Sequence, residues 1–109
     1  MPRRVDAHNH ELAERHRDTT FVLSPLVYSP GWAALTKNQQ NILADTAKPM
    51  YPGHITALVA TLGAKRVLFG SETPYMAPIV EREKFKYAGL SAEDEALVLG
   101  GNAARVLGL

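Results

Sequence analysis

The chain has 109 residues, of which 46% are hydrophobic and 21% are charged. Twelve lysines and arginines nearly balance eleven aspartates and glutamates, so the formal net charge is +1, and the basic residues are scattered along the chain. This composition predicts one folded domain over residues 1–109. It disfavours disorder, and it disfavours nucleic acid or an anionic membrane as a partner, because both need a clustered basic surface.

The sequence contains no cysteine, which excludes disulfides, thiolate metal sites and a cysteine nucleophile. Its amino-terminal residues turn polar before an apolar signal segment could form. No apolar run approaches the length that crosses a membrane. From these features we expect a cytoplasmic protein.

The chain is expected to begin with an extended segment, followed by a short helix and a strand. Residues 5–10 have no clear period, and an extended conformation would place His8 and His10 on one face. A short helix follows them. Residues 19–23 are β-branched and aromatic, which predicts a strand that ends where Ser24 precedes a proline.

The middle of the chain predicts a strand, a helix and a second strand. Residues 41–46 form a short strand that carries Asp45 near its end. Residues 54–62 have apolar positions at helical spacing, and Gly63 supplies a stop. The apolar run within residues 65–70 then predicts a buried strand, directly followed by polar residues.

The last third of the chain predicts helices. A charged helix is expected over residues 79–87, and Ser91 with Asp94 three residues later is typical of a capping box that opens a final helix. Gly100 and its neighbouring glycine are expected to interrupt that helix. Alternating strands and helices indicate a parallel sheet, in which catalytic groups lie just past the carboxyl ends of the strands.

Three segments of the sequence carry a family likeness. Residues 62–74 read Leu-Gly-Ala-Lys-Arg-Val-Leu-Phe-Gly-Ser-Glu-Thr-Pro, residues 89–95 read Gly-Leu-Ser-Ala-Glu-Asp-Glu, and residues 101–109 read Gly-Asn-Ala-Ala-Arg-Val-Leu-Gly-Leu. In this order they resemble the carboxyl-terminal end of the amidohydrolase-related family, and residues 11–23 and 41–46 resemble its sixth and seventh strand regions. The resemblance implies a partial (β/α)8 TIM barrel of about four βα units with parallel strands.

The resemblance also implies a divalent metal, which we expect to be zinc. His8 and His10 are similar to the His-x-His pair of the family's first strand, although His8 could instead mark a later strand. Glu72 stands where the family usually has an aspartate that binds metal or acts as a general base. The sixth strand ends at Ser24, where the family usually has a metal-binding histidine.

Each candidate residue also has a simpler explanation. The histidine pair could be an exposed polar terminus, and the Glu72 carboxylate could cap the amides of the following turn. Asp45 could line the crevice at the strand ends or cap the next turn, and Tyr75 could border a pocket, so we regard both as candidate substrate-binding residues. Trp32 is expected in the core.

The function implied by the resemblance is that of a metal-dependent hydrolase. It would act on an ester, amide or lactone, or decarboxylate a carboxylated small molecule, through metal-activated water. The alternative is a non-catalytic half-barrel remnant that serves as an interaction or structural module. A full barrel takes about 250 residues, so we expect a truncated domain whose open sheet edges lead to a homodimer or to a partner chain that completes the barrel.

Overall fold

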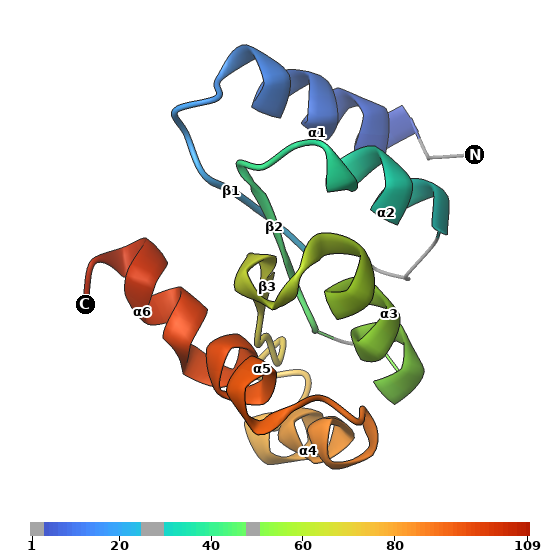
Figure 1. Cartoon of the computed structure of the whole chain (residues 1–109), viewed down its shortest axis with the longest axis vertical. Coiled ribbons are helices and arrows are strands. Elements are labelled where there is room, and N and C mark those ends of the chain that lie inside the picture. Colours follow the sequence, from blue (N-terminus) through green and yellow to red (C-terminus); the bar gives the residue numbers. More distant parts are fainter. Residues whose placement is uncertain (1–3, 25–29, 48–50) are drawn as a thin grey trace.

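Three parallel strands form the centre of the fold, and helices connect them (Figure 1). The computed structural model describes residues 4–24, 30–47 and 51–109. The strands are β1 (Phe21–Leu23), β2 (Ile42–Asp45) and β3 (Val67–Leu68), in the sheet order β1-β2-β3. The predicted parallel α/β sheet is therefore confirmed, with three strands in the described ranges where about four βα units were expected.

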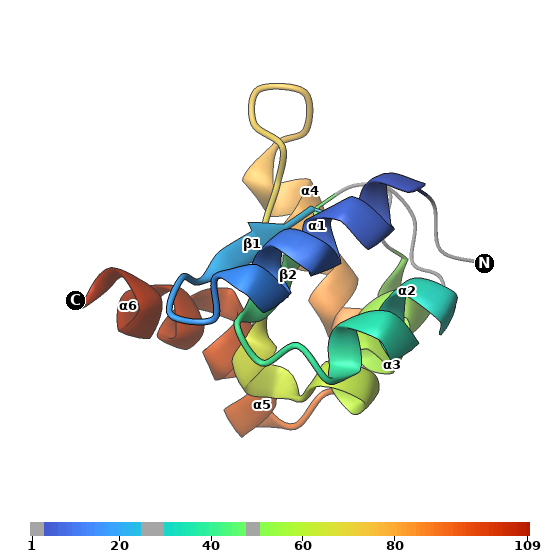
Figure 2. The ribbon, with the colours of Figure 1, turned by 90° about the horizontal axis from the view of Figure 1, so that it is seen from above.

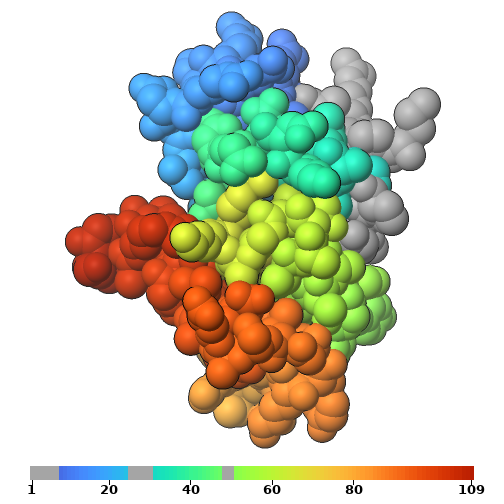
Figure 3. Space-filling model, in the orientation of Figure 1, coloured from blue at the N-terminus to red at the C-terminus, as the bar shows by residue number. Residues whose placement is uncertain are grey.

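Helices flank the sheet and make up most of the carboxyl-terminal half. They are α1 (Arg4–Arg15), α2 (Pro30–Lys37), α3 (Pro52–Leu62), α4 (Pro78–Glu83), α5 (Ala92–Ala96) and α6 (Asn102–Leu107), with 3₁₀ turns η1 (Ala64–Arg66) and η2 (Lys84–Tyr87) and a π-helical turn η3 (Leu97–Gly101). The end of α6 projects from the body of the molecule (Figure 3). In the described ranges, no helix has the length and apolar character needed to cross a membrane.

The amino-terminal segment is helical, so the expectation that residues 5–10 are extended is wrong. These residues lie inside α1. Two buried residues of this helix, His10 and Ala13, are three positions apart, which is the spacing that places side chains on one helical face. This face packs against α2, and its burial stabilises the helix. The three-residue spacing of His10 and Ala13 was the sequence signal that the prediction of an extended segment did not take into account.

Several predicted helix ends are confirmed. The stop at Gly63 is confirmed, and its φ of 87° suits glycine. Helix α3 begins at Pro52, a favoured first residue, which is two residues before the predicted start at His54. The Ser91 hydroxyl accepts a hydrogen bond from the Asp94 amide at 3.1 Å. The expected interruption at the two glycines does not occur, because η3 joins α5 to α6 without a break in helical structure.

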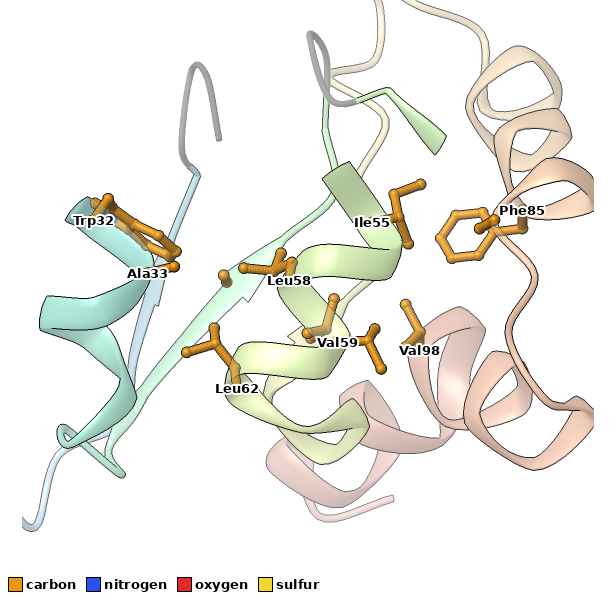
Figure 4. Packing of buried hydrophobic residues seen from close by; sticks show 11 residues of the cluster. Trp32, Ala33, Ile55, Leu58, Val59, Leu62, Phe85 and Val98 are labelled. Atoms are coloured by element: carbon orange, nitrogen blue, oxygen red, sulfur yellow. The ribbon is translucent and has the colours of Figure 1, made fainter. Parts of the chain in front are cut away.

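The core lies between one face of the sheet and the helices (Figure 4). The strand register pairs Leu23 with Ala44, and Ala44 with Val67, so these three side chains share a face. That face packs against the buried side chains Trp32, Ala33, Ile55, Leu58, Val59, Leu62, Phe85, Ala88 and Val98. Trp32 is 3% exposed, as its predicted core position requires.

A buried guanidinium ties the start of β3 to the connection between α2 and β2. Arg66 donates hydrogen bonds to the carbonyl oxygens of Thr36 at 2.8 Å, Lys37 at 3.0 Å and Ile42 at 2.9 Å, and also to that of Gln39. Burial lowers the pKa of Arg66, but a guanidinium keeps its proton in proteins. These hydrogen bonds of Arg66 therefore fix β3 relative to β2 and so help to position the carboxyl ends of the two strands.

Candidate active site

The carboxyl ends of the three strands meet at one edge of the sheet and carry polar residues. Ser24 follows β1, Asp45 ends β2, and Gly70-Ser71-Glu72 follows β3. Alternate residues of a strand point to the same face, so Asp45 points away from the face that packs against the helical core. In a closed barrel that other face lines the interior.

Asp45 has the best-defined orientation of the predicted site residues. The Ser24 hydroxyl donates a hydrogen bond to Oδ2, and the backbone N–H of Ala47 donates to Oδ1 at 3.0 Å. The capping role considered for Asp45 is therefore confirmed. Since both oxygens are held, the carboxylate has a fixed direction at the strand ends, and it can accept a further hydrogen bond or a proton.

The chain after β3 comes close to Asp45 because residue 70 is glycine. A Cβ added to Gly70 would lie 3.0 Å from Asp45 Cγ, 3.2 Å from Asp45 Cβ and 3.3 Å from Ala47 Cβ. These separations are shorter than ordinary van der Waals contact, so a side chain at this position would displace the carboxylate. Sequence reasoning did not assign Gly70 or Ser24 to the site. A glycine at a strand end, which often marks a close backbone approach, was the available signal.

Glu72 lies in a loop that projects from the body of the molecule (Figure 2). Its φ is 54°, in the left-handed region that is unfavourable for a residue with a long side chain. The Tyr75 amide donates to the Glu72 carbonyl at 2.8 Å, and the Ser71 and Thr73 hydroxyls are 2.8 Å apart. Glu72 and Tyr75 are both exposed, and in the described part of the chain no hydrogen bond joins the Glu72 carboxylate to the amides that it was considered to cap.

The two candidate metal-binding histidines point in different directions. Both lie in α1, where residues two apart are separated by about 200° around the helix axis. His8 is exposed, whereas His10 is buried, with Nε2 2.7 Å from the Thr36 hydroxyl. That hydroxyl donates to the carbonyl oxygen of Trp32, so His10 Nε2 is the donor in the first bond. The structure therefore does not bring His8 and His10 together as a chelating pair.

The described residues do not by themselves fit a divalent metal ion. Within these ranges there is no group of three or more His, Cys, Asp or Glu side chains that could hold one. The Asp45 carboxylate already accepts hydrogen bonds from Ser24 and Ala47, and Ser24 occupies the position where the resemblance implies a histidine. Tetrahedral or octahedral coordination would need further ligands from other strands.

A hollow on the surface lies elsewhere. It has a volume of about 320 Å³ and is lined by Ile79, Arg82, Glu83, Lys86 and Glu95. A hydrogen bond from Lys86 to Glu83 raises the pKa of this lysine, and the ion pair spans 2.8 Å. No residue of the strand ends lines this hollow, so it is not part of the candidate site.

A protein-family model described as Amidohydrolase matches residues 5–109. The match covers almost the whole chain, so the chain belongs to the amidohydrolase family. No curated protein matches it.

Solved structures share the fold. An amidohydrolase from Burkholderia multivorans with bound HEPES matches with a TM-score of 0.75 and 17% identity, over 97% of this chain and 50% of that chain. A dihydroxybenzoic acid decarboxylase from a Polaromonas species matches with a TM-score of 0.74 and 14% identity, over 95% of this chain and 40% of that chain. A 5-carboxyvanillate decarboxylase from Sphingomonas paucimobilis matches with a TM-score of 0.68 and 21% identity, over 90% of this chain and 36% of that chain.

This chain therefore spans between 36% and 50% of the length of these three solved structures. Together with the parallel sheet, this coverage confirms the predicted partial barrel. At these identities the likeness shows the fold alone, and the fold does not determine the activity.

Proposed function

We propose that this chain supplies one side of an amidohydrolase active site. The complete site would hydrolyse an ester, amide or lactone, or remove the carboxylate of a carboxylated small molecule. The observation that supports this most strongly is the Asp45 carboxylate, held by Ser24 and by the Ala47 amide at the carboxyl end of β2. Carboxyl ends of parallel strands are where barrel enzymes place their reacting groups.

Three residues have roles in this proposal. Asp45 accepts a hydrogen bond or a proton from the substrate, because its two oxygens are oriented before any substrate arrives. Glu72 serves as metal ligand or general base, and its left-handed φ is a strain of the kind that clusters at functional sites. Tyr75, which is 85% exposed in the same loop, contacts the substrate.

We propose a divalent metal ion, zinc in the first instance, as the cofactor. A structure of the Burkholderia amidohydrolase contains zinc, and that of the Polaromonas decarboxylase contains manganese. Such an ion supplies Lewis-acid activation of water or of a carbonyl group. Because the described residues alone do not fit the ion, its remaining ligands have to come from other strands.

The test uses a linked protein that contains the missing strands. In this protein a glycine-serine linker joins the half of the Burkholderia amidohydrolase that this chain does not match to the amino terminus of this chain. Turnover of lactones, amides and aromatic carboxylic acids is measured with added zinc or manganese. We expect Asp45→Asn to lower kcat by about a hundredfold or more, and Glu72→Gln to lower it as well. The control is Glu93→Gln, an exposed residue of α5. Full activity of Asp45→Asn would contradict the proposal.

A second function is favoured by one observation. Ser24 stands where the resemblance implies a metal-binding histidine, and its hydroxyl is already bonded to Asp45. This arrangement would suit a non-catalytic half-barrel that serves as an interaction or structural module. If the linked protein turned over none of the three substrate classes with metal present, the module would be favoured over the enzyme.

A further inference from the structure

The surface hollow described above is formed by side chains of α4, η2 and α5. Ile79, Arg82, Glu83 and Lys86 are spaced at i, i+3, i+4 and i+7, so they share one face of α4 and its continuation η2, and Glu95 comes from α5. Its volume of about 320 Å³ is at the lower end of the range for small-molecule sites, about 300–1,000 Å³. The hollow lies outside the candidate active site, so what it binds does not depend on the proposed function.

The charged side chains of α4 and η2 pair with one another, with the exception of Arg82. Lys84 Nζ lies 2.5 Å from Glu81 Oε2, and Lys86 Nζ lies 2.8 Å from Glu83 Oε1. The hydrogen bond and the charge of Glu83 raise the pKa of Lys86, so this lysine is protonated and its charge is offset within the pair. In the part of the chain that the structure describes, the exposed Arg82 side chain has no ion pair and no hydrogen bond. Its guanidinium is therefore available to a ligand.

The Glu95 carboxylate is a second unpaired charge at the hollow. The backbone N–H of Glu95 donates to the Ser91 carbonyl at 2.9 Å, but among the described residues its carboxylate contacts no cation and accepts no hydrogen bond. Arg82 and Glu95 line the same hollow without pairing with each other. Ile79, whose side chain is 62% exposed, adds apolar surface. The hollow thus offers a cation, an anion and an apolar surface to one ligand.

We propose that this hollow binds a small zwitterion that has an apolar part. The carboxylate of the ligand accepts hydrogen bonds from the Arg82 guanidinium, whose planar N–H groups match a carboxylate in a two-point contact. The ammonium group of the ligand donates to the Glu95 carboxylate, and the apolar part covers Ile79. Free amino acids with an aliphatic side chain belong to this class.

A zwitterion fits these charges better than a ligand with one kind of charge. A carboxylate alone would be attracted by Arg82 and repelled by Glu95, and an amine alone would be attracted by Glu95 and repelled by Arg82. Two cationic and two anionic side chains line the hollow, so its formal charge is zero and it attracts neither sign as a whole. A divalent cation would find only two carboxylates there, of which Glu83 is already bound to Lys86.

An NMR titration of the 109-residue chain tests the proposal by following the Arg82 side-chain N–H and the backbone amides of α5. The probes are L-leucine and ε-aminocaproate, in which the two charges lie farther apart. Because the charged groups of the hollow are open to water, each contact is weak, and we expect saturable shifts with a Kd of about 1–10 mM for at least one probe. The matched ligands with one charge are isocaproate and isoamylamine for leucine, and hexanoate and pentylamine for ε-aminocaproate. They should bind at least about fivefold more weakly than the zwitterion.

Two pairs of variants assign the binding to the hollow. Arg82→Gln and Glu95→Gln each remove one charge from it and should each weaken binding by about fivefold or more. The controls Arg17→Gln and Glu93→Gln remove an exposed charge of the same sign outside the hollow and should leave the Kd within about twofold. Far-UV circular dichroism checks that each variant keeps its fold.

Three results would overturn the proposal. The first is the absence of saturable shifts with both zwitterions. The second is equal affinity for a zwitterion and for one of its matched ligands, because the hollow would then read only one charge. The third is an unchanged Kd in Arg82→Gln or in Glu95→Gln, because the ligand would then bind without that side chain.

Discussion

Gly70→Ala is expected to disturb the Asp45 carboxylate, because Gly70 lies just after β3, the strand next to β2. The added methyl would lie 3.0 Å from Asp45 Cγ and 3.3 Å from Ala47 Cβ, against an ordinary contact distance of about 3.5–4.0 Å. Neither neighbour moves freely, because Asp45 is bonded to Ser24 and to the Ala47 amide. Overpacking of this kind costs about 1–3 kcal/mol in the free energy of unfolding.

Urea denaturation of the 109-residue chain measures this cost. The control is Gly53→Ala, since a Cβ at Gly53 meets nothing within 4 Å and the residue lies in the first turn of α3. We expect the control to be neutral or to stabilise by up to about 1 kcal/mol. In an Asp45→Ala background, Gly70→Ala should cost less, because the contact with Cγ is gone. Equal stability of Gly70→Ala and Gly53→Ala would refute the close approach of β3 to Asp45.

Three further substitutions are tested by urea denaturation: two remove side chains that hold the strands in place, and the third relieves backbone strain in the loop after β3. Arg66→Met leaves four buried or partly buried carbonyl groups without their donor and should lower the free energy of unfolding by about 3 kcal/mol; a loss below about 1 kcal/mol would show that water replaces the guanidinium. Asn102→Ala removes donors to the Ala64 and Val67 carbonyls, at 2.6 and 2.8 Å, and should cost about 2 kcal/mol, with faster exchange of the neighbouring Phe69 amide. Glu72→Asn relieves the φ of 54° and should raise stability by about 0.5–1 kcal/mol; a decrease would mean that the Glu72 side chain makes stabilising contacts.

The parts of the fold that could be predicted are those that local pattern determines. The strand at Ile42–Asp45 and the helix α3 follow from short apolar runs, helical spacing and a glycine stop, and all of these signals are local. The prediction for the segment around His10 is wrong because it gave no weight to the three-residue spacing of His10 and Ala13, and because the contact that buries this face is remote in the sequence. His10 bonds to Thr36, 26 positions away, and no window of neighbouring residues contains that partner.

The sequence predicts which residues of the candidate site lie at the strand ends, but it does not predict the contacts between them. The polar residues that follow two short apolar runs in the sequence are sufficient to predict Asp45 and Glu72 as strand-end groups. The bond between Ser24 and Asp45, and the space that Gly70 leaves for it, depend on the register between strands. Register is set by packing of the whole sheet, so the sequence alone could not supply it.

The metal content of the isolated chain, purified without chelator or affinity tag, would decide whether the residues of this chain alone are sufficient to bind a metal ion. We expect elemental mass spectrometry to find far less than one zinc or manganese ion per chain, even after dialysis against excess zinc, and about one ion per molecule of the linked protein. A content of about one ion in the isolated chain would contradict the proposal that the remaining ligands come from other strands.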